Sequence, residues 1–488
     1  MEYVRRVVDD DLDELLPHLP AVALEGAKGV GKTSTAQQRA ATVLRLLDPG
    51  QRQTIAADPT VIRHLPKPLL LDEWQLEPAL WNHVREAVDE DPSGNQFLLT
   101  GSAGPTRGIR MHSGAGRVVR MVLRPMILSE RHRISPTVSL KNLLRGDAVV
   151  EGQTSLSLSD YVDEILCSGF PAFQGLPERA VRIQLESYLA RAVDHDLPEG
   201  GFLVRRPAAL RAWLTAYAAA TSTTTSYSRI LDAATPGEDE KLSRNTVTSY
   251  REALERLFLL DPLPAWVPSL SPLKRLVAAP KHHLADPALA AHLIGATKDS
   301  LLYGPESTFL GALFESLATL CVRVMAQSAE ATTGHLRTKG GEHEIDLMVE
   351  GRDRRVVGVE VKLASIITDR DVRHLRWLKQ ELGERVTDLV VLTTGPTPSA
   401  GPTALRWFRW GSWLPEGAAS VPSMPWRWRS SRRLLADERS RGFKWCEWPV
   451  PVSRRFVPGP GMPAFTSPHP AAPARPGCPR RHPRVSRS

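Results

Sequence analysis

The sequence predicts an α/β protein with several domains, and three observations support this fold class. A glycine-rich turn at residues 26–33 lies between a short apolar strand and a helical segment. A second apolar strand, residues 69–71, ends in two adjacent acidic residues. Two further strands, residues 345–349 and 356–362, flank a polar turn. Apolar strands that alternate with helical segments are typical of sheets covered by helices, and 488 residues give room for two to four domains.

Residues 26–33 match the phosphate-binding pattern G-x-x-x-x-G-K-[ST] in full. In this pattern the backbone N–H groups point at a polyphosphate, Lys32 reaches the β- and γ-phosphates, and the Thr33 hydroxyl ligates Mg²⁺. The expected nucleotide contacts are Gly26, Ala27, Lys28, Gly29, Val30, Gly31, Lys32, Thr33 and Ser34. No guanine-reading Asn-Lys-x-Asp segment is present, which favours ATP over GTP, although the sequence does not strictly define the base. Mg²⁺ is the expected cofactor.

The strand at residues 69–71 supplies the second half of a nucleotide site. Ligands of open α/β sheets bind at the carboxyl ends of the strands, where Asp72 and Glu73 follow this one. We expect Asp72 to hold Mg²⁺ through water and Glu73 to act catalytically by orienting or deprotonating the attacking water. A third strand, residues 97–99, is followed by Thr100. Either the Thr100 hydroxyl senses the γ-phosphate, or the segment that begins at Thr100 is a simple turn.

Phosphoryl transfer also needs positive charge on the γ-phosphate, and an arginine often supplies it. Arg117 is the predicted catalytic arginine because mobile glycines precede it. Three other arginines flank it: Arg107, Arg110 and Arg120. The alternative is that this segment is a solvated basic loop.

The first domain is expected at residues 1–130 and a Ser-rich connector at 131–160. The pattern predicts a helix from Thr33 to Leu47 after the phosphate loop and a helix from Trp81 to Val88. It also predicts strands at residues 21–24, 54–57 and 118–123.

Residues 161–300 are predicted to be mainly helical. Helices are expected at residues 183–193, 207–219, 227–233 and 243–260, and a strand at 281–286. Short helices followed by strand residues favour a winged helix-turn-helix. Its candidate recognition helix would begin with Arg244, Asn245 and Thr248, which serve either DNA contact or packing.

The strands around residues 351–355 predict a β-hairpin in a last ordered domain, residues 301–395. If the hairpin is symmetric about Asp353, Asp346 faces Glu360 on the polar side, and Ile345 shares the apolar side with Leu347. Opposed carboxylates about 5 Å apart can chelate a divalent metal, and Lys362 can steady an attacking water. Glu315, on a helix from residue 310 to 324, is a further candidate ligand. The alternative is a solvated hairpin face with an acid–base pair.

The net charge of +8 belongs to the C-terminal tail, residues 396–488. This tail holds sixteen Lys or Arg against four Asp or Glu, so the preceding body carries 46 basic and 50 acidic residues. The tail also holds 17 of the 40 prolines and seven of the twelve tryptophans, which predicts disorder. It is either a nucleic-acid-binding arm or, as we favour, out-of-frame translation that begins after Gly395.

Three absences in the sequence indicate a cytoplasmic protein with no membrane span. There is no run of eighteen apolar residues, and the acidic N-terminus lacks the order of a signal peptide. The four cysteines show no C-x-x-C spacing, which argues against structural zinc and a disulfide framework.

Taken in order, these motifs resemble a bacterial and archaeal family of predicted ATP-binding proteins. Further matching segments are Gly169-Phe170-Pro171, Pro280-Lys281-His282 and Gly311 to Glu315. The resemblance implies an AAA-type ATPase domain, a winged-helix middle and a C-terminal domain with an endonuclease-like core. The D…E-x-K residues resemble the restriction-endonuclease superfamily, which implies Asp346 and Glu360 as metal ligands and Lys362 as catalytic lysine. AAA-like proteins often use a neighbour's arginine, so a homo-oligomer is one expectation. The resemblance ends near Thr394.

Overall fold

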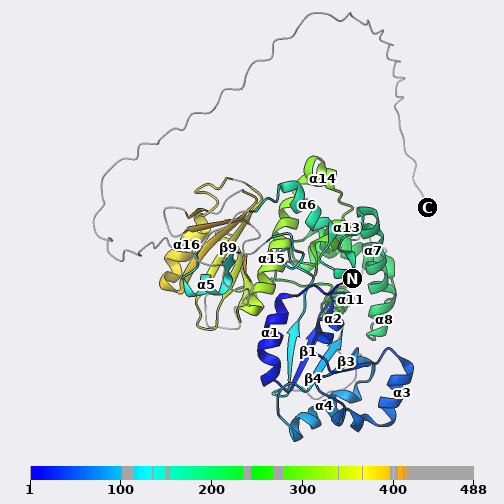
Figure 1. Ribbon diagram of the computed structural model, residues 1–488. Helices are drawn as coiled ribbons and strands as arrows, with labels where there is room; N and C mark the ends of the chain where they lie inside the picture. Colours follow the sequence, from blue (N-terminus) through cyan, green and yellow to red (C-terminus); the bar gives the residue numbers. More distant parts are fainter. Residues whose placement is uncertain are drawn as a thin grey trace, which may run out of the picture. The chain divides into compact units, whose positions relative to one another are not determined.

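The computed structural model describes residues 2–101, 115–134, 137–149, 154–234, 243–266, 279–338, 340–364, 366–395, 399–400, 405–409 and 413–414. They all belong to one compact unit, residues 1–420 (Figure 1). A second unit, residues 421–488, lies outside the described residues, and with it most of the tail for which we predicted disorder.

The N-terminal sheet has five parallel strands in the order β2-β3-β4-β1-β5, which confirms the predicted parallel sheet. Its strands are β1 (Ala21–Glu25), β2 (Thr42–Arg45), β3 (Leu69–Asp72), β4 (Phe97–Gly101) and β5 (Val118–Val122). The helices are α1 (Val7–Leu15), α2 (Lys32–Gln37), α3 (Pro49–Ala57) and α4 (Ala79–Glu90). The central strands are buried on both faces, since alternate residues of β1, β3 and β4 enter two different apolar clusters.

Two elements of this domain differ from their predictions. The helix predicted from Thr33 to Leu47 is wrong, because α2 ends at Gln37 and residues 42–45 pair with β3 as β2. The strand predicted at residues 54–57 is also wrong, because these residues lie in α3. The Asp48 side chain accepts hydrogen bonds from the backbone N–H groups of Gly50 (2.8 Å) and Gln51 (3.1 Å), and these bonds start α3.

Helices dominate the middle of the chain, as predicted. They are α6 (Leu158–Cys167), α7 (Glu178–Arg191), α8 (Leu197–Glu199), α9 (Pro207–Ala219), α10 (Tyr227–Ala234), α11 (Arg244–Arg256), α13 (Pro287–Leu293) and α14 (Lys298–Tyr303). A single π-helical turn, residues 192–196, joins α7 to α8. After α11, antiparallel bridges pair Leu260 with Leu284 and Leu263 with Lys281.

The C-terminal sheet has six strands in the order β11-β12-β10-β9-β8-β7. These strands are β7 (Thr332–Arg337), β8 (Glu344–Glu350), β9 (Val356–Lys362), β10 (Val386–Thr393), β11 (Ser399–Ala400) and β12 (Leu405–Arg409). One face packs on α15 (Leu310–Ser328) and α5 (Leu140–Arg145), and the other on α16 (Arg373–Leu382). A two-stranded sheet joins β6 (Val138–Ser139) to β13 (Trp413–Leu414).

The C-terminal sheet draws on residues beyond the predicted domain limits of 301 and 395. Helix α5, from the predicted connector, contacts β9 and β10. Strand β12 pairs in parallel with β10, from Leu389–Leu405 to Thr393–Arg409. The sheet therefore extends past the point where the composition changes.

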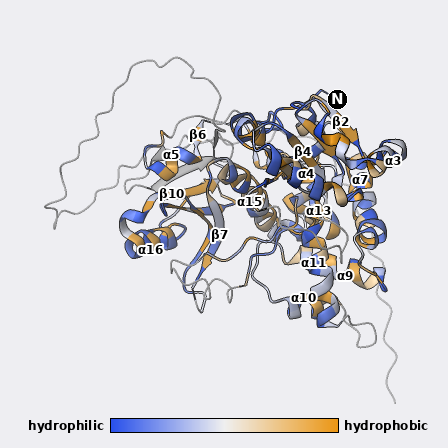
Figure 2. Ribbon diagram, turned by 90° about the horizontal axis from the view of Figure 1, so that it is seen from below, coloured by the Kyte–Doolittle hydropathy of each residue, from blue (hydrophilic) through white to orange (hydrophobic). Residues whose placement is uncertain are grey.

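One helical stretch in the described part of the chain, Pro305–Ser328, is long and apolar enough to cross a membrane by length and composition. Of the most apolar 18 residues of this stretch, 67% are buried within the protein. Figure 2 shows α15, the main part of this stretch, among other elements of the molecule, and it contacts both α13 and β9. These contacts are those of a core helix.

Candidate functional site

The phosphate loop begins directly after β1 and depends on its glycines. The backbone φ angles of Gly26, Gly29 and Gly31 are 153°, 80° and 101°. A Cβ atom added at Gly26 would lie 2.2 Å from the carbonyl oxygen of Leu123. Only glycine therefore fits this close approach between the loop and the chain after β5.

Lys32 lies folded over the loop. Its Nζ donates hydrogen bonds to the carbonyl oxygens of Gly26 (2.9 Å) and Ala27 (2.8 Å), and the residue is buried. Burial lowers the pKa of Lys32 to about 8, although the nearby carboxylates of Glu73 and Asp72 oppose this shift. The cation is thus already positioned among the loop's backbone groups.

Asp72 connects β3 to α2 and β4 at the carboxyl edge of the sheet. Its Oδ1 accepts hydrogen bonds from the hydroxyl groups of Thr33 (2.6 Å) and Thr100 (2.7 Å). Thr100 is fully buried, and its hydroxyl donates to Asp72. Thr33 and Asp72 present hydroxyl and carboxylate oxygens, the ligands that Mg²⁺ prefers, so this pair fits the predicted metal.

Glu73 has a left-handed backbone with φ of 58° and ψ of 45°. Such a conformation is rare for a residue other than glycine and costs about 1–3 kcal/mol. The Glu73 carboxylate accepts a hydrogen bond from the Gln75 side chain. Both residues line the cavity in front of the loop.

A cavity of about 770 Å³ opens over the phosphate loop. One side is formed by the first domain, including Lys28, Lys32, Thr33 and Ser34. The other side comes from the helical region: Pro171, Ala172, Arg191, Asp196, Glu199, Gly200 and Leu257. Lys28 crosses from the loop to the helical side, with its Nζ 2.6 Å from Asp196 Oδ1. The cavity is large enough for a nucleotide and joins the two regions.

The predicted catalytic arginine, Arg117, lies away from this cavity. It directly precedes β5, whose first residue pairs with the first residue of β1, so Arg117 is at the opposite edge of the sheet from the loop. Its Nε lies 2.6 Å from Asp89 Oδ1. Arg120 Nε lies 3.4 Å from Glu25 Oε1, whereas Arg107 and Arg110 are outside the described residues.

Among the residues that the structure describes, Arg191 is the arginine that lines the cavity, from the last turn of α7. No local pattern distinguishes it from the other exposed basic residues of that helix. Its Nε lies 3.9 Å from Asp196 Oδ1.

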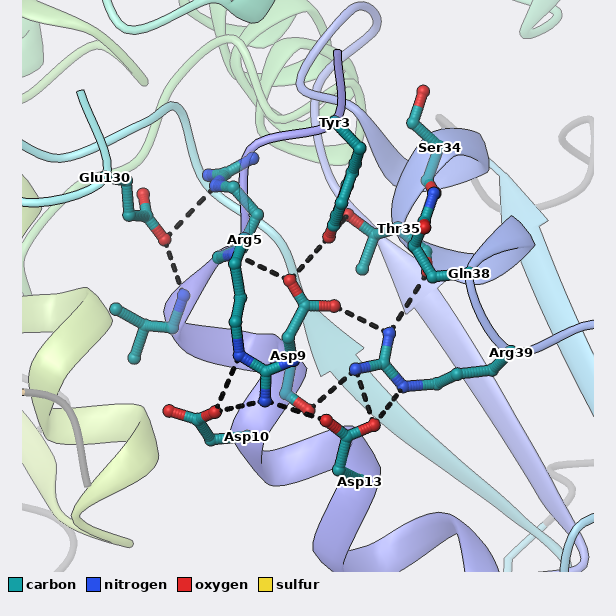
Figure 3. A network of polar contacts seen from close by, with 12 residues as sticks. Tyr3, Arg5, Asp9, Asp10, Asp13, Ser34, Thr35, Gln38, Arg39 and Glu130 are labelled. Atoms are coloured by element: carbon teal, nitrogen blue, oxygen red, sulfur yellow. Dashed lines mark hydrogen bonds and ion pairs between the residues drawn. The ribbon is translucent and has the colours of Figure 1, made fainter. Parts of the chain in front are cut away.

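A network of polar contacts anchors α2 on α1 (Figure 3). Arg39, just after α2, contacts Asp9 Oδ1 at 2.6 Å and Asp13 Oδ1 at 2.7 Å. Tyr3 donates to Thr35 at 3.2 Å and also to Asp9. Nearby, Arg6 donates to the Val30 carbonyl oxygen at 2.9 Å. The N-terminal segment thus fixes both the loop and the helix that leaves it.

The second candidate site has the predicted hairpin register. Leu347 pairs with Val359 and Val349 with Val357, as the symmetry about Asp353 requires. The regular ladder starts at Leu347; before it, the Asp346 Oδ2 accepts a hydrogen bond from the Val361 N–H at 2.9 Å.

The acidic residues of this hairpin do not form the solvated face considered as the alternative. Asp346 and Glu360 are both buried, with 9% and 2% exposure, because α15 and α16 cover the two faces of the sheet. Ile345 packs with the α16 cluster, opposite to Leu347, so its predicted side is wrong. Glu315 and Lys362 do lie near Asp346, and Lys281 joins them, which sequence reasoning missed.

Three parts of the chain match family models. Residues 18–132 match an AAA domain, and residues 158–300 and 310–403 match two domains of unknown function, DUF8612 and DUF4143. Similar proteins include uncharacterized protein Mb2031c of Mycobacterium bovis and uncharacterized protein Rv2008c of Mycobacterium tuberculosis. Each is 25% identical over 376 residues, which cover 74% of this chain and 74% of the relative.

Two solved structures are also similar in part. The Walker-type ATPase PABY2304 of Pyrococcus abyssi is 16% identical with a TM-score of 0.33, covering 59% of this chain and 95% of that one. The replication initiator DnaA bound to AMPPCP and single-stranded DNA is 14% identical with a TM-score of 0.22, covering 51% and 87%. At such scores neither structure defines this fold. The family match and the complete loop motif agree instead, and residues 18–132 form an AAA-type ATPase domain.

Proposed function

We propose that this protein is a Mg²⁺-dependent ATPase. The observation that carries the proposal is the 2.6 Å hydrogen bond from Thr33 to Asp72, because it joins the phosphate loop to the acidic strand end. Lys32 and the loop N–H groups bind the phosphates, and Thr33 and Asp72 hold the metal. Bound Mg²⁺ neutralises charge on the β- and γ-phosphate oxygens.

Glu73 is assigned to orienting or deprotonating the attacking water. Its strained backbone supports this role, because rare conformations of this kind cluster at functional sites. It also lines the same cavity as Lys32 and Thr33. The carboxylate is therefore available to a water molecule beside a bound triphosphate.

Two substitutions test this function. Lys32→Ala should abolish binding of Mg²⁺-ATP in calorimetry, whereas Glu73→Gln should keep binding and reduce steady-state turnover by about 10²- to 10⁴-fold. Lys298→Ala, on the surface of α14, is the control and should behave like the parent. A Lys32→Ala protein that binds and hydrolyses ATP normally refutes the proposal. A single burst without steady turnover in the parent protein would instead indicate a nucleotide-switched regulatory protein.

We further propose that the nucleotide state is coupled to a winged-helix region and to the DNA that this region binds. The cavity wall contributed by residues 171–200 and the 2.6 Å Lys28–Asp196 contact support the coupling. Helices α9, α10 and α11 followed by the antiparallel bridges support the winged helix. DNA is the proposed partner, through Arg244, Asn245 and Thr248. ATP turnover measured with and without duplex DNA tests this proposal, and equal rates contradict it.

The second candidate function is ATP-gated, metal-dependent DNA cleavage by an endonuclease-like C-terminal domain. One observation favours it: Glu315, Asp346, Glu360 and Lys362 come together in one place. This candidate requires that plasmid incubated with Mn²⁺ or Mg²⁺ and ATP be nicked by the parent and not by Asp346→Ala. Equal nicking by the two proteins, or none, contradicts this candidate.

A further inference from the structure

A buried lysine lies at the centre of the acidic cluster on the C-terminal sheet. Lys281 Nζ is 2.8 Å from Glu315 Oε1, 2.9 Å from Asp346 Oδ1 and 3.5 Å from Glu344 Oε1. Its side chain is 1% exposed. One ammonium group therefore contacts carboxyl groups from α15 and from two positions of β8.

The fold fixes the position of this lysine. Its backbone N–H and carbonyl both pair with Leu263, at 2.9 Å each. The next residue, His282, is held by its own backbone N–H to Thr223 O (2.9 Å) and by its ring Nε2 near Thr225 O (2.6 Å). The ammonium group is thus directed into the cluster by a paired segment that precedes Glu315 by more than thirty residues.

Lys281 and the acidic residues shift one another's pKa values. Burial opposes the charged form of Lys281, but Asp346 and Glu315 outweigh it and raise the lysine pKa. Burial also opposes ionisation of Asp346, and the ammonium groups of Lys281 and Lys362 nevertheless lower its pKa. Lys362 is a second internal cation, 2.8 Å from Glu360 Oε2. The ammonium groups of Lys281 and Lys362 therefore offset part of the negative charge of the cluster.

Three of the carboxylate oxygens that a divalent metal would use are already engaged. Asp346 uses Oδ1 for Lys281 and Oδ2 for the Val361 N–H, and Glu360 uses Oε2 for Lys362. Glu360 Oε1 is buried and accepts no hydrogen bond from a described residue. Across the described ranges, no group of three His, Cys, Asp or Glu side chains is arranged to hold a metal ion. The residues thus do not fit the metal that the hairpin's resemblance to restriction endonucleases implies.

We propose that Lys281 is an internal counter-ion that takes the place of a divalent cation among Glu315, Asp346 and Glu360 and excludes metal from the resting protein. A metal bound to the same oxygens would lie within a few ångströms of the ammonium group, and two cations at that distance repel each other. This inference does not depend on the ATPase proposal, because its readout is metal binding without nucleotide.

Mn²⁺ titrations of the full-length chain test the proposal. All proteins carry Asp72→Asn, which removes the candidate metal site in the ATPase domain. Lys281→Met should lower the melting temperature in EDTA, because it leaves the carboxyl groups without their cation. It should then bind one Mn²⁺, detected by electron paramagnetic resonance, at least about tenfold more tightly than the protein with Lys281. Mn²⁺ should restore its melting temperature.

Two controls separate this effect from general destabilisation. Lys379→Met removes a partly buried lysine of the same domain, whose Nζ donates to the Val386 carbonyl oxygen, and should gain no Mn²⁺ affinity. Adding Asp346→Asn to Lys281→Met should abolish the gain. A folded Lys281→Met protein with unchanged Mn²⁺ affinity overturns the proposal.

A comparison that keeps Lys281 decides the question if Lys281→Met does not fold. The proposal expects Asp346→Asn and its parent to retain the same amount of Mn²⁺, since Asp346 is already engaged by the lysine. Mn²⁺ bound by the parent and lost in Asp346→Asn shows that the metal enters despite Lys281, and overturns the inference.

Lys281→Gln, which keeps length and polarity, is the second variant and should bind Mn²⁺ as Lys281→Met does.

Discussion

Gly26 shows how one residue sets the geometry of the nucleotide site. Its φ of 153° places the loop against the chain that leaves β5, and the Leu123 N–H donates to the Glu25 carbonyl oxygen at 2.8 Å. The loop is therefore held in place both by the chain after β5 and by the hydrogen bonds of Lys32. A side chain at this position would separate the two segments.

We predict that Gly26→Ala lowers the free energy of unfolding by roughly 2–4 kcal/mol, from backbone strain and the clash with the Leu123 carbonyl. Gly175→Ala is the matched control: its φ is 76°, but nothing lies within 4 Å of the added Cβ. It should cost only about 1–2 kcal/mol. Urea denaturation of the two variants checks the difference, and equal losses would show that the contact with Leu123 is unimportant.

At the scale of elements, Asp261 joins the first domain to α15. Its carboxylate contacts Arg124, just after β5, at 2.8 Å and Arg323, on α15, at 2.9 Å. Burial opposes ionisation of Asp261, but the two guanidinium groups outweigh it and lower its pKa to about 2. Because the folded-state pKa is below the unfolded value, this stabilisation is present at neutral pH and is lost as the pH falls from about 4 to 2.

Asp261→Asn should therefore cost about 2 kcal/mol of unfolding free energy at pH 7 and about half as much at pH 3. Urea denaturation at the two pH values measures this change. Asp299→Asn, on α14, provides the comparison and should show no such convergence with the parent. A deficit of Asp261→Asn that is the same at both pH values would contradict the assigned pKa.

Strand β12 also makes a testable contribution at this scale. A chain ending at residue 395 lacks β12 and leaves the β10 edge unpaired. We expect it to lose a few kcal/mol of stability, at about 1 kcal/mol per lost hydrogen bond. A chain ending at residue 420 should melt like the full-length protein. Equal melting temperatures for the two truncated chains would show that β12 does not stabilise the sheet.

Local rules decided which elements could be predicted. The phosphate loop and the hairpin register followed from short motifs whose residues are adjacent in sequence. Residues 42–45 and 54–57 were exchanged between helix and strand because short apolar runs fit both patterns, and pairing with β3 decided the first of them. Lys281 and Arg191 reach their sites from distant segments, so no local signal could have placed them.

At the scale of the whole molecule, the nucleotide cavity is shared between two regions. The first domain provides Lys32 and Thr33, and the helical region provides Arg191. The Gly169 N–H donates to Asp286 Oδ2 at 2.6 Å, which fixes the turn that carries Pro171 into the cavity wall. Catalysis is therefore expected to depend on the helical region.

We predict that Arg191→Ala reduces the ATP turnover number by at least about a hundredfold, because Arg191 lines the cavity over the phosphate loop and would offset charge on a bound γ-phosphate. Arg182→Ala removes a surface arginine of the same helix, paired with Glu178, and should retain parental turnover. Steady-state kinetics with a parallel measurement of ATP affinity distinguishes catalysis from binding. Unchanged turnover in Arg191→Ala would exclude this arginine from the reaction.

The position of Lys281 bears on how the C-terminal region can be studied. The lysine belongs to the stretch that matches one family, whereas the carboxyl groups it neutralises belong to the stretch that matches another. A fragment that starts at residue 301 would carry the acids and Lys362 but not Lys281. Such a fragment would either bind cations from the buffer or lose its structure. The DNA cleavage activity measured on it would therefore differ from that of the full-length protein.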